Sequence, residues 1–152
     1  MKKILAIIPA RGNSKGVPLK NLAKLNGNSL LYYTVNASLK SKFINRTIVS
    51  TDNRKIKEES KRLGAEVIDR PKKLSGDRVS IEPAIKYTLD YLKKKEGYTP
   101  DIIVLLSNTH PFRTELHIDG ALSLFSKKKY DSVLSGYETH TFFWKKQANS
   151  TV

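Results

Sequence analysis

Hydrophobic residues along the chain fall into short apolar runs, separated by longer segments in which apolar positions recur every three or four residues. Apolar runs without alternation are typical of strands buried on both faces, and the longer period is typical of helices. The runs predict strands at 4–8, 47–50, 66–68, 102–106 and 132–134. The longer segments predict helices at 30–39, 54–63, 81–95 and 115–125, with Gly64 as the stop of the second. This alternation predicts an α/β domain with a mostly parallel sheet and helices on both faces.

The segment that follows the first predicted strand is strongly basic. Residues 7–21 read IIPARGNSKGVPLKN, with Arg11, Lys15 and Lys20 but no acidic residue. In parallel α/β sheets, ligands bind beyond the carboxyl ends of the strands. Gly12 and Gly16 allow backbone N–H groups to turn toward an anion, and the three cations supply charge around the same pocket. The segment is therefore suited to a polyphosphate.

Two common phosphate-binding motifs do not describe this segment. Lys15 precedes Gly16 instead of following it, and Pro18 blocks the immediate helix that a Walker loop opens into. The spacing of Gly12 and Gly16 does not fit the glycine pattern of dinucleotide-binding folds. A flexible basic surface loop remains the plain alternative.

Length and composition narrow the class of protein. A chain of 152 residues suits one domain, and the absence of cysteine excludes a disulfide scaffold and thiolate chemistry. The apolar run after the two lysines at the start is too short for a secretory signal, and no segment reaches the roughly twenty apolar residues of a membrane helix. We therefore expect a cytoplasmic protein without a membrane partner.

The net charge of +14 raises the possibility of a nucleic-acid partner. Many of the lysines, however, lie scattered on predicted helix faces, where a solvated surface explains them. RNA-recognition aromatics and zinc-finger spacing are both missing from the sequence. A nucleic-acid binder stays an alternative, but nucleic acid is not the expected partner.

The segment at 7–21 resembles the signature of the acylneuraminate cytidylyltransferases, which include the CMP-sialic acid synthetases and their legionaminic and pseudaminic acid relatives. Further similar motifs follow in the same order: IVSTD at 48–52, RP at 70–71, LSGDRVS at 74–80 and LLSNTHPFRT at 105–114. The resemblance implies a Rossmann-like, three-layer nucleotidyltransferase fold over residues 1–152. It also implies transfer of CMP from CTP to an acidic nine-carbon (nonulosonic) sugar with release of pyrophosphate, for surface glycan (lipopolysaccharide or capsule) synthesis.

By motif position, the resemblance assigns roles to individual residues. Arg11 and Ser14 resemble the residues that hold the triphosphate, and Lys20 resembles the lysine that offsets charge at the reacting phosphate, so Arg11 and Lys20 are the candidate catalytic residues. The expected nucleotide site comprises Arg11, Gly12, Ser14, Lys15, Lys20, Asn21, Arg70, Asp77 and Ser80, of which Asn21 and Arg70 resemble contacts to the cytidine. Positioning and charge neutralisation are the main needs of phosphoryl transfer, so no protein nucleophile is required.

The sugar side departs from the family pattern. The family more often has Gln-Pro-Thr-Ser-Pro where this chain has Ser-Asn-Thr-His-Pro at 107–111. Ser107 occupies the position of a sugar-contacting glutamine, and its shorter side chain leaves the identity of the nonulosonic acid open. Arg113 is a candidate partner for the sugar carboxylate, because a guanidinium fork suits carboxylates; a surface arginine that caps the next helix is the alternative.

The resemblance covers only the first two thirds of the family, so we expect the C-terminal part of the fold, with the aspartates that hold catalytic Mg²⁺, to be missing after residue 152. Asp52 and Asp77 are present near strand ends, but an N-cap and a turn explain them more simply. Phe142, Phe143 and Trp144 suggest a subunit contact, and a homodimer is expected. The alternatives are a truncated, catalytically silent CTP-binding module and an enzyme for the eight-carbon sugar of lipopolysaccharide.

Overall fold

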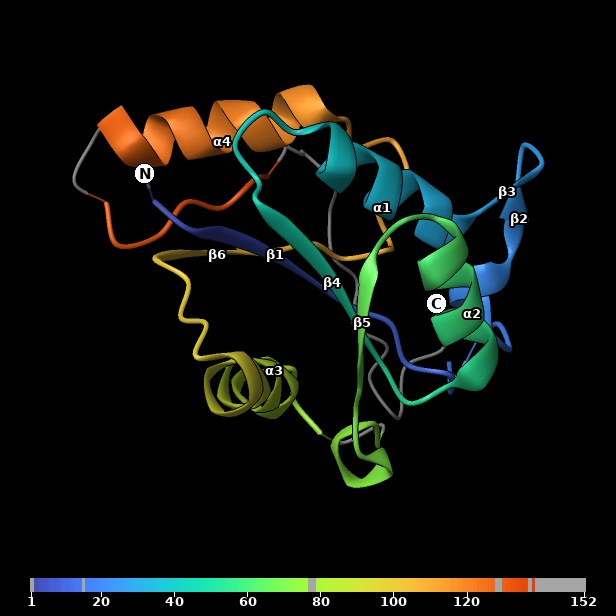
Figure 1. The fold of residues 1–152 in the computed structure, drawn as a ribbon. Helices are drawn as coiled ribbons and strands as arrows, with labels where there is room; N and C mark the ends of the chain where they lie inside the picture. Colours follow the sequence, from blue (N-terminus) through green and yellow to red (C-terminus); the bar gives the residue numbers. More distant parts are fainter. Residues whose placement is uncertain (1, 15, 77–78, 128–129, 137, 139–152) are drawn as a thin grey trace, which may run out of the picture.

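Four parallel strands, in the spatial order β5-β4-β1-β6, form the central sheet. The computed structural model describes residues 2–14, 16–76, 79–127, 130–136 and 138. The strands are β1 (Ile4–Pro9), β4 (Arg46–Thr51), β5 (Glu66–Asp69) and β6 (Ile102–Leu105). The α-helices are α1 (Leu30–Lys40), α2 (Arg54–Arg62), α3 (Glu82–Glu96) and α4 (Glu115–Lys127). Figure 1 shows α1, α2 and α4 on one face of the sheet and α3 on the other.

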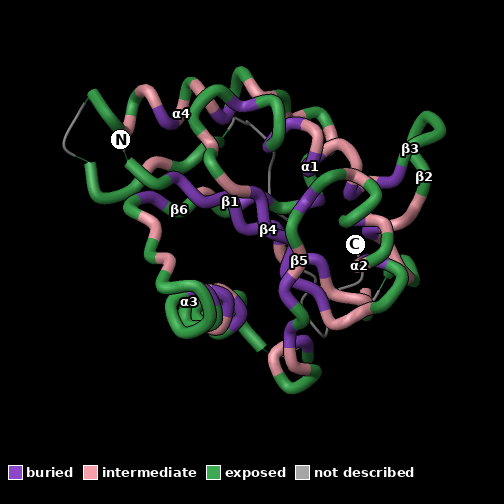
Figure 2. Tube along the Cα trace, in the orientation of Figure 1, coloured by how far each residue is buried: buried purple, intermediate pink, exposed green. Residues whose placement is uncertain are grey.

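The two faces of β1 build two separate hydrophobic cores. Ile4, Ala6 and Ile8 pack with buried residues of α1, α2 and α4, whereas Leu5 and Ile7 pack with Leu92 of α3. Successive side chains of a strand point to opposite faces, so a continuous apolar run is what a strand covered on both faces needs. Figure 2 shows burial concentrated along β1 and β4. The predicted three-layer α/β fold is thereby confirmed.

A short hairpin links the segment after β1 to α1. After the 3-10 helix η1 (Lys20–Leu22), strands β2 (Lys24–Leu25) and β3 (Asn28–Ser29) pair antiparallel around Asn26 and Gly27. Both turn residues have positive φ, 47° and 80°, which is the conformation that an Asn-Gly hairpin turn requires. Ser29 then caps α1 by accepting a hydrogen bond from the Tyr32 N–H.

The predicted elements match the observed ones within two residues at each end, with one exception. The segment 132–134 forms no strand, and Leu134 is 92% exposed. A strand needs a neighbour to satisfy its backbone, and none of the described strands pairs with this segment. The predicted strand at 132–134 is therefore wrong, although its apolar residues fit the pattern.

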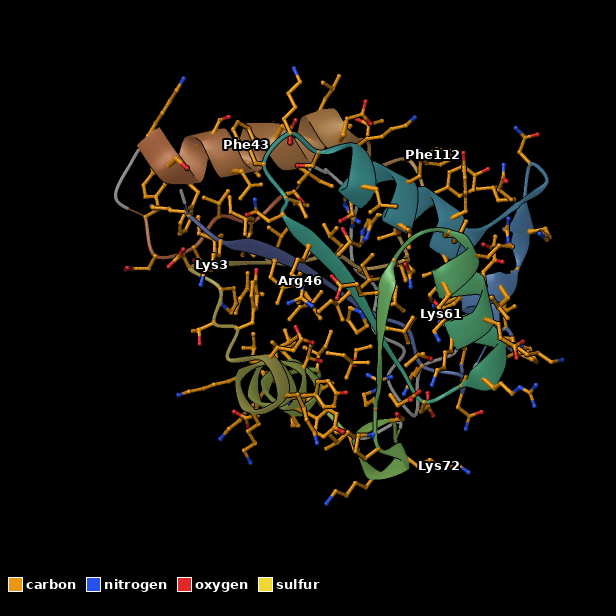
Figure 3. The ribbon with its side chains drawn as sticks, in the orientation of Figure 1. Lys3, Phe43, Arg46, Lys61, Lys72 and Phe112 are labelled. Carbon is orange, nitrogen blue, oxygen red and sulfur yellow. The ribbon has the colours of Figure 1, made fainter. Side chains whose placement is uncertain are left out.

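A polar cluster ties α3 to the amino-terminal end of the sheet. Arg46, labelled in Figure 3, lies at the start of β4 and pairs with Glu66 of β5 and with Glu96 at the end of α3. Its guanidinium also lies 4.5 Å from the centre of the Tyr98 ring. This cluster lies at the sheet end opposite to the segment 7–21, so it supports the fold and not the candidate site. Within the described part of the chain, no helix is both long and apolar enough to cross a membrane.

Candidate nucleotide site at the strand ends

A pocket of about 360 Å³ opens where β1 and β6 end. The segment after β1 supplies two cations, Arg11 and Lys20, and the segment after β6 supplies hydroxyl and amide groups. The lining residues are Pro9, Arg11, Ser14, Gly16, Val17, Lys20, Asn21, Ser107, Asn108 and Thr109. This lining carries two positive side chains and no carboxylate, so it suits an anion.

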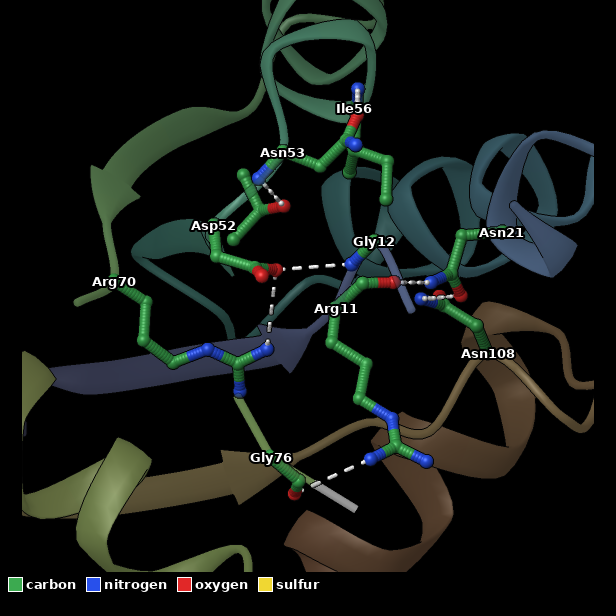
Figure 4. A network of polar contacts seen from close by, with 10 residues as sticks. Arg11, Gly12, Asn21, Asp52, Asn53, Ile56, Arg70, Gly76 and Asn108 are labelled. Carbon is green, nitrogen blue, oxygen red and sulfur yellow. Dashed lines mark hydrogen bonds and ion pairs between the residues drawn. The ribbon is translucent and has the colours of Figure 1, made fainter. Parts of the chain in front are cut away.

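The peptide group between Arg11 and Gly12 is held at both of its ends (Figure 4). The Gly12 N–H donates to the carboxylate of Asp52 at 2.9 Å, and the Arg11 carbonyl accepts from the Asn21 amide at 2.9 Å. Asp52 directly follows β4, and Asn21 lies in η1. Two different elements therefore fix the backbone from which the Arg11 side chain departs.

The bond network continues across the sheet to the segment after β6. The Asn108 Nδ2 donates to the Asn21 Oδ1 at 3.0 Å, and the two residues are only 4% and 6% exposed. A buried amide pair of this kind is costly to break, because each partner would lose a hydrogen bond without gaining water. Hydrogen bonds thus connect the ends of β4, β1 and β6 through Asp52, the Arg11–Gly12 peptide, Asn21 and Asn108.

Gly12 is required by the close approach of the helix α2. A Cβ atom at this position would lie 2.7 Å from the Asn53 Nδ2 and 2.8 Å from its Cβ. Asn53 cannot easily move, because its side chain caps α2 by accepting from the N–H groups of Lys55 and Ile56. The interpretation of Asp52 as the N-cap of α2 is therefore wrong: Asn53 caps the helix, and this leaves Asp52 to bind the segment after β1.

Arg70 lies on the other side of Asp52. Its side chain is only 5% exposed, and its Nη2 lies 3.9 Å from the Asp52 Oδ1, too far for a hydrogen bond. Burial lowers the pKa of Arg70, the Asp52 carboxylate raises it, and the nearby positive charge of Arg11 lowers it. The buried Nε and Nη2 of Arg70 have no hydrogen-bond partner among the described residues. A buried guanidinium with this little compensation is suited to an anionic or carbonyl ligand.

Arg11 and Arg70 lie around the same segment after η2 (Lys72–Leu74). The Arg11 Nη1 lies 3.4 Å from the Gly76 carbonyl oxygen, and Figure 4 shows the Arg70 guanidinium on the same side of the sheet. The two like charges are close enough to affect the pKa of Arg70. The site is therefore positive both inside the pocket and along its edge at Arg70.

The opposite wall of the pocket consists of residues that follow β6. The hydroxyl of Ser107 lies 2.8 Å from that of Thr109, which lies 3.1 Å from the Nδ1 of His110. Arg113 donates to the Ser107 carbonyl at 3.1 Å and does not line the pocket. Burial lowers the pKa of Arg113. In this structure Arg113 braces the segment, and its contact with a sugar carboxylate stays a prediction.

The structure thus brings together five of the predicted site residues, namely Arg11, Ser14, Lys20, Asn21 and Ser107, in one pocket. Gly12 and Arg70 lie beside it, but the Gly12 N–H faces Asp52 and not the pocket. Ser80 lies away from the pocket before α3, where its hydrogen bond with Glu82 lowers the pKa of that carboxyl. Lys15 and Asp77 lie outside the described residues.

Three polar residues at the site were not assigned to it by sequence reasoning. Asp52 and Asn108 hold the polar network, and Thr109 lines the pocket. Each follows a predicted strand by a few residues, and that position is the signal that could have identified them. What the sequence could not show is which side chains meet across neighbouring strands.

The described residues do not form a metal centre. None of the groups of His, Asp and Glu that the structure describes has three or more members placed to bind one ion. The carboxylate of Asp52 is already engaged with Gly12 and close to Arg70. The residues described here therefore do not fit a protein-built Mg²⁺ site.

Comparison with known proteins decides the family. The sequence pattern of the cytidylyltransferases matches residues 5–150. The chain belongs to the cytidylyltransferase family. It is 37% identical over 134 residues to an N-acylneuraminate cytidylyltransferase of Escherichia coli, covering 88% of this chain and 31% of that protein. It is 34% identical to N-acylneuraminate cytidylyltransferase A of Danio rerio, covering 95% of this chain and 32% of that protein. The predicted resemblance to this family is confirmed.

A solved cytidylyltransferase shows the same fold. The structure of CMP:2-keto-3-deoxy-manno-octonic acid synthetase, determined with CTP, superposes with a TM-score of 0.69 at 20% identity. The match covers 84% of this chain and 48% of that chain. This chain thus spans about a third of the length of its cytidylyltransferase relatives and about half of the solved one. The expected share of two thirds is therefore wrong for these relatives.

Proposed function

We propose that the pocket at the ends of β1 and β6 binds CTP, and that the protein transfers CMP from CTP to an acidic nine-carbon sugar with release of pyrophosphate. The observation that carries this proposal is the meeting of Arg11 and Lys20 with Ser14, Asn21 and Ser107 in one pocket. The chain belongs to the cytidylyltransferases, and its relatives are named for N-acylneuraminate. An acidic sugar is therefore the second substrate that we propose.

Arg11 and Lys20 would act by charge. The oxygen of the sugar hydroxyl attacks the phosphate next to the ribose and forms the new phosphorus–oxygen bond, the bond to the outer two phosphates breaks, and the hydroxyl proton passes to solvent. Negative charge on the leaving pyrophosphate rises during this step, and cations beside the phosphates stabilise it. Arg11 and Lys20 are the cations among the described residues that line the pocket, and we propose that they do so. Ser14 and Lys15 complete the proposed triphosphate contacts.

Arg70 and Asn21 would bind the cytidine, and Asp77 would complete the nucleotide site; Gly12 and Ser80, expected in the same site, do not line this pocket. The Nε and Nη2 of Arg70 are buried without a partner among the described residues, so a carbonyl ligand would satisfy them once the groups that cover them move. Asn21 already uses one donor and one acceptor inside the protein. It retains a second amide hydrogen and a second lone pair for the nucleotide.

The second substrate would bind toward Ser107 and Arg113. Ser107 lies in the pocket beside Thr109, and their hydroxyl groups suit the hydroxyls of a sugar. The buried Nη1 of Arg113 has no partner in the described part of the chain, which supports a carboxylate ligand if the segment 107–113 moves on binding. We leave open which nonulosonic acid is accepted.

Three further features of the proposal come from the family. Mg²⁺ would enter with CTP on its phosphate oxygens, because few protein ligands are needed there. A homodimer is proposed, but the aromatic residues Phe142, Phe143 and Trp144 lie outside the described residues. A cytoplasmic location and a place in lipopolysaccharide or capsule synthesis complete the proposal.

The experiment is a coupled assay of pyrophosphate release with CTP, Mg²⁺ and a panel of nonulosonic acids. Pyrophosphate release that depends on both the sugar and CTP, with the CMP-sugar detected by mass, supports the proposed reaction. CTP binding without release supports a catalytically silent nucleotide-binding module. Release with the eight-carbon sugar alone would change the proposed substrate.

A further inference from the structure

The backbone at Arg11 is held by Asp52, which does not line the pocket, and by Asn21, which does. The Gly12 N–H and the Arg11 carbonyl belong to one peptide group, and the two ends of that group are bound by Asp52 and Asn21. A peptide group is planar, so two hydrogen bonds at opposite ends fix its plane. The chain before Arg11 is anchored too, since the Ala10 N–H donates to the Ser50 carbonyl at the end of β4, so the direction in which the Arg11 side chain leaves the backbone is restricted.

We propose that Asp52 and Asn108 are positioning residues for Arg11, Asp52 by binding the Gly12 N–H and Asn108 by holding Asn21 against the Arg11 carbonyl. This inference rests on the proposed nucleotide site and adds two residues to it. Asp52 is well placed because its side chain is only 15% exposed and Gly12 is within hydrogen-bond distance, whereas Arg70 is not. Asn108 is buried and donates to Asn21 from the other side of β1.

The arrangement matches what a cationic site needs. A long arginine side chain loses much conformational entropy on binding an anion, and a backbone fixed in advance reduces that cost. The two positioning residues come from the strands on either side of β1, since Asp52 follows β4 and Asn108 follows β6. The Gly12 backbone also lies close to Asn53, since a Cβ at Gly12 would lie 2.7 Å from the Asn53 Nδ2. This close packing further restricts the backbone of the segment after β1.

The first readout is independent of nucleotide. Amide hydrogen exchange of Gly12, followed by nuclear magnetic resonance on the isotope-labelled chain, reports the hydrogen bond to Asp52. We expect protection in the wild type and exchange about tenfold faster in Asp52→Ala, the loss expected for one hydrogen bond to a charged group. Asp52→Asn keeps an acceptor oxygen and should keep most of the protection. An equal Gly12 rate in wild type and Asp52→Ala would overturn the proposal, whether or not the chain binds CTP.

The second readout is a double-mutant cycle on CTP affinity, which tests whether Asp52 and Asn108 act through Arg11. Asp52→Ala and Asn108→Ala should each weaken CTP binding about tenfold. In an Arg11→Ala background, either substitution should add little, because the side chain that it positions is gone. Additive losses in the cycle would contradict the proposal, since a general loss of structure would act equally in both backgrounds.

Asp69 provides a matched control. It ends β5 as Asp52 follows β4, but its carboxylate binds the Lys57 ammonium and not the segment after β1. Asp69→Asn should leave both the Gly12 exchange rate and the CTP affinity unchanged. If the wild type fails to bind CTP while the protection of the Gly12 N–H depends on Asp52, the proposed function is wrong. The role of Asp52 in holding the backbone at Gly12 is then still supported.

Discussion

The carboxylate of Asp52 accepts a hydrogen bond from the backbone N–H of Gly12 at 2.9 Å and thereby ties the segment after β1 to the end of β4. This contact explains why an acidic residue is tolerated beside a site built from cations. Asp52 does not line the pocket, and its charge lies between a backbone donor and Arg70. The pocket is lined by two cations and no carboxylate, which suits a nucleoside triphosphate.

Lys20 should contribute to nucleotide affinity through its charge. We expect Lys20→Ala to weaken CTP binding about tenfold, the loss typical of one charge-assisted contact. Calorimetric titration measures this change. Lys24→Ala is the control, because Lys24 lies nearby on β2 but is not among the residues that line the pocket. Equal losses in the two variants would mean that general surface charge, and not the pocket, attracts the nucleotide.

Gly12→Ala should destabilise the fold. The new methyl group would meet Asn53 at 2.7 Å, and we expect a loss of about 1–3 kcal/mol in the free energy of unfolding. Gly120→Ala is the matched control, because nothing lies within 4 Å of a Cβ there and Gly120 is inside α4. Alanine in a helix should stabilise by about 0.5–1 kcal/mol. Urea unfolding measures both changes, and a Gly12→Ala protein as stable as wild type would disprove the close approach of Asn53.

Arg46 should be important for stability but not for nucleotide binding. Its paired carboxylates raise its pKa, and Arg46→Met would remove these bonds together with the contact to Tyr98. We expect a loss of about 1–3 kcal/mol, as for hydrogen bonds between charged groups. In contrast, Arg54→Met should change stability little, because its ion pair with Glu58 is exposed. Thermal unfolding compares the variants, and an equal effect of both would contradict the role of the cluster.

Glu59 should make stability depend on pH in the acid range. Hydrogen bonds from Arg62 and Ser29 lower the pKa of Glu59, against the opposite effect of burial. A carboxyl whose pKa is lower in the folded state stabilises the fold fully above its unfolded pKa, and this contribution is lost as the pH falls through the folded pKa. Glu59→Gln should therefore reduce stability at neutral pH, and the difference from wild type should shrink toward acid pH. The same substitution at Glu58, in an exposed pair, should have little effect.

Much of the fold was predictable because its two central strands, β1 and β4, are buried on both faces and each strand contains a short apolar run. The apolar run at 4–8 predicted β1 within one residue, and the same reasoning located β4, β5 and β6. The rule failed at 132–134, where apolar residues are present but no described strand lies alongside. A run of apolar residues shows that a segment can be buried. It does not show whether another strand lies beside the segment to pair with it.

The site was predictable to the extent that strand ends determine it. Arg11, Lys20 and Ser107 were expected near one another and line one pocket. The role of Asp52 was not predictable, because it depends on how closely β4 and β1 end together. The N-cap role fell to Asn53 for the same reason, since both residues are good caps and only the backbone path distinguishes them.

The decisive test of the nucleotide site is calorimetric titration of the chain with CTP in the presence of Mg²⁺, with GTP as the competing nucleotide and Arg11→Ala as the variant. We predict that CTP binds selectively, that GTP binds far more weakly, and that Arg11→Ala loses most of the affinity for CTP. Equal binding of both nucleotides, or no binding of either, would contradict a cytidine-nucleotide site at the ends of β1 and β6.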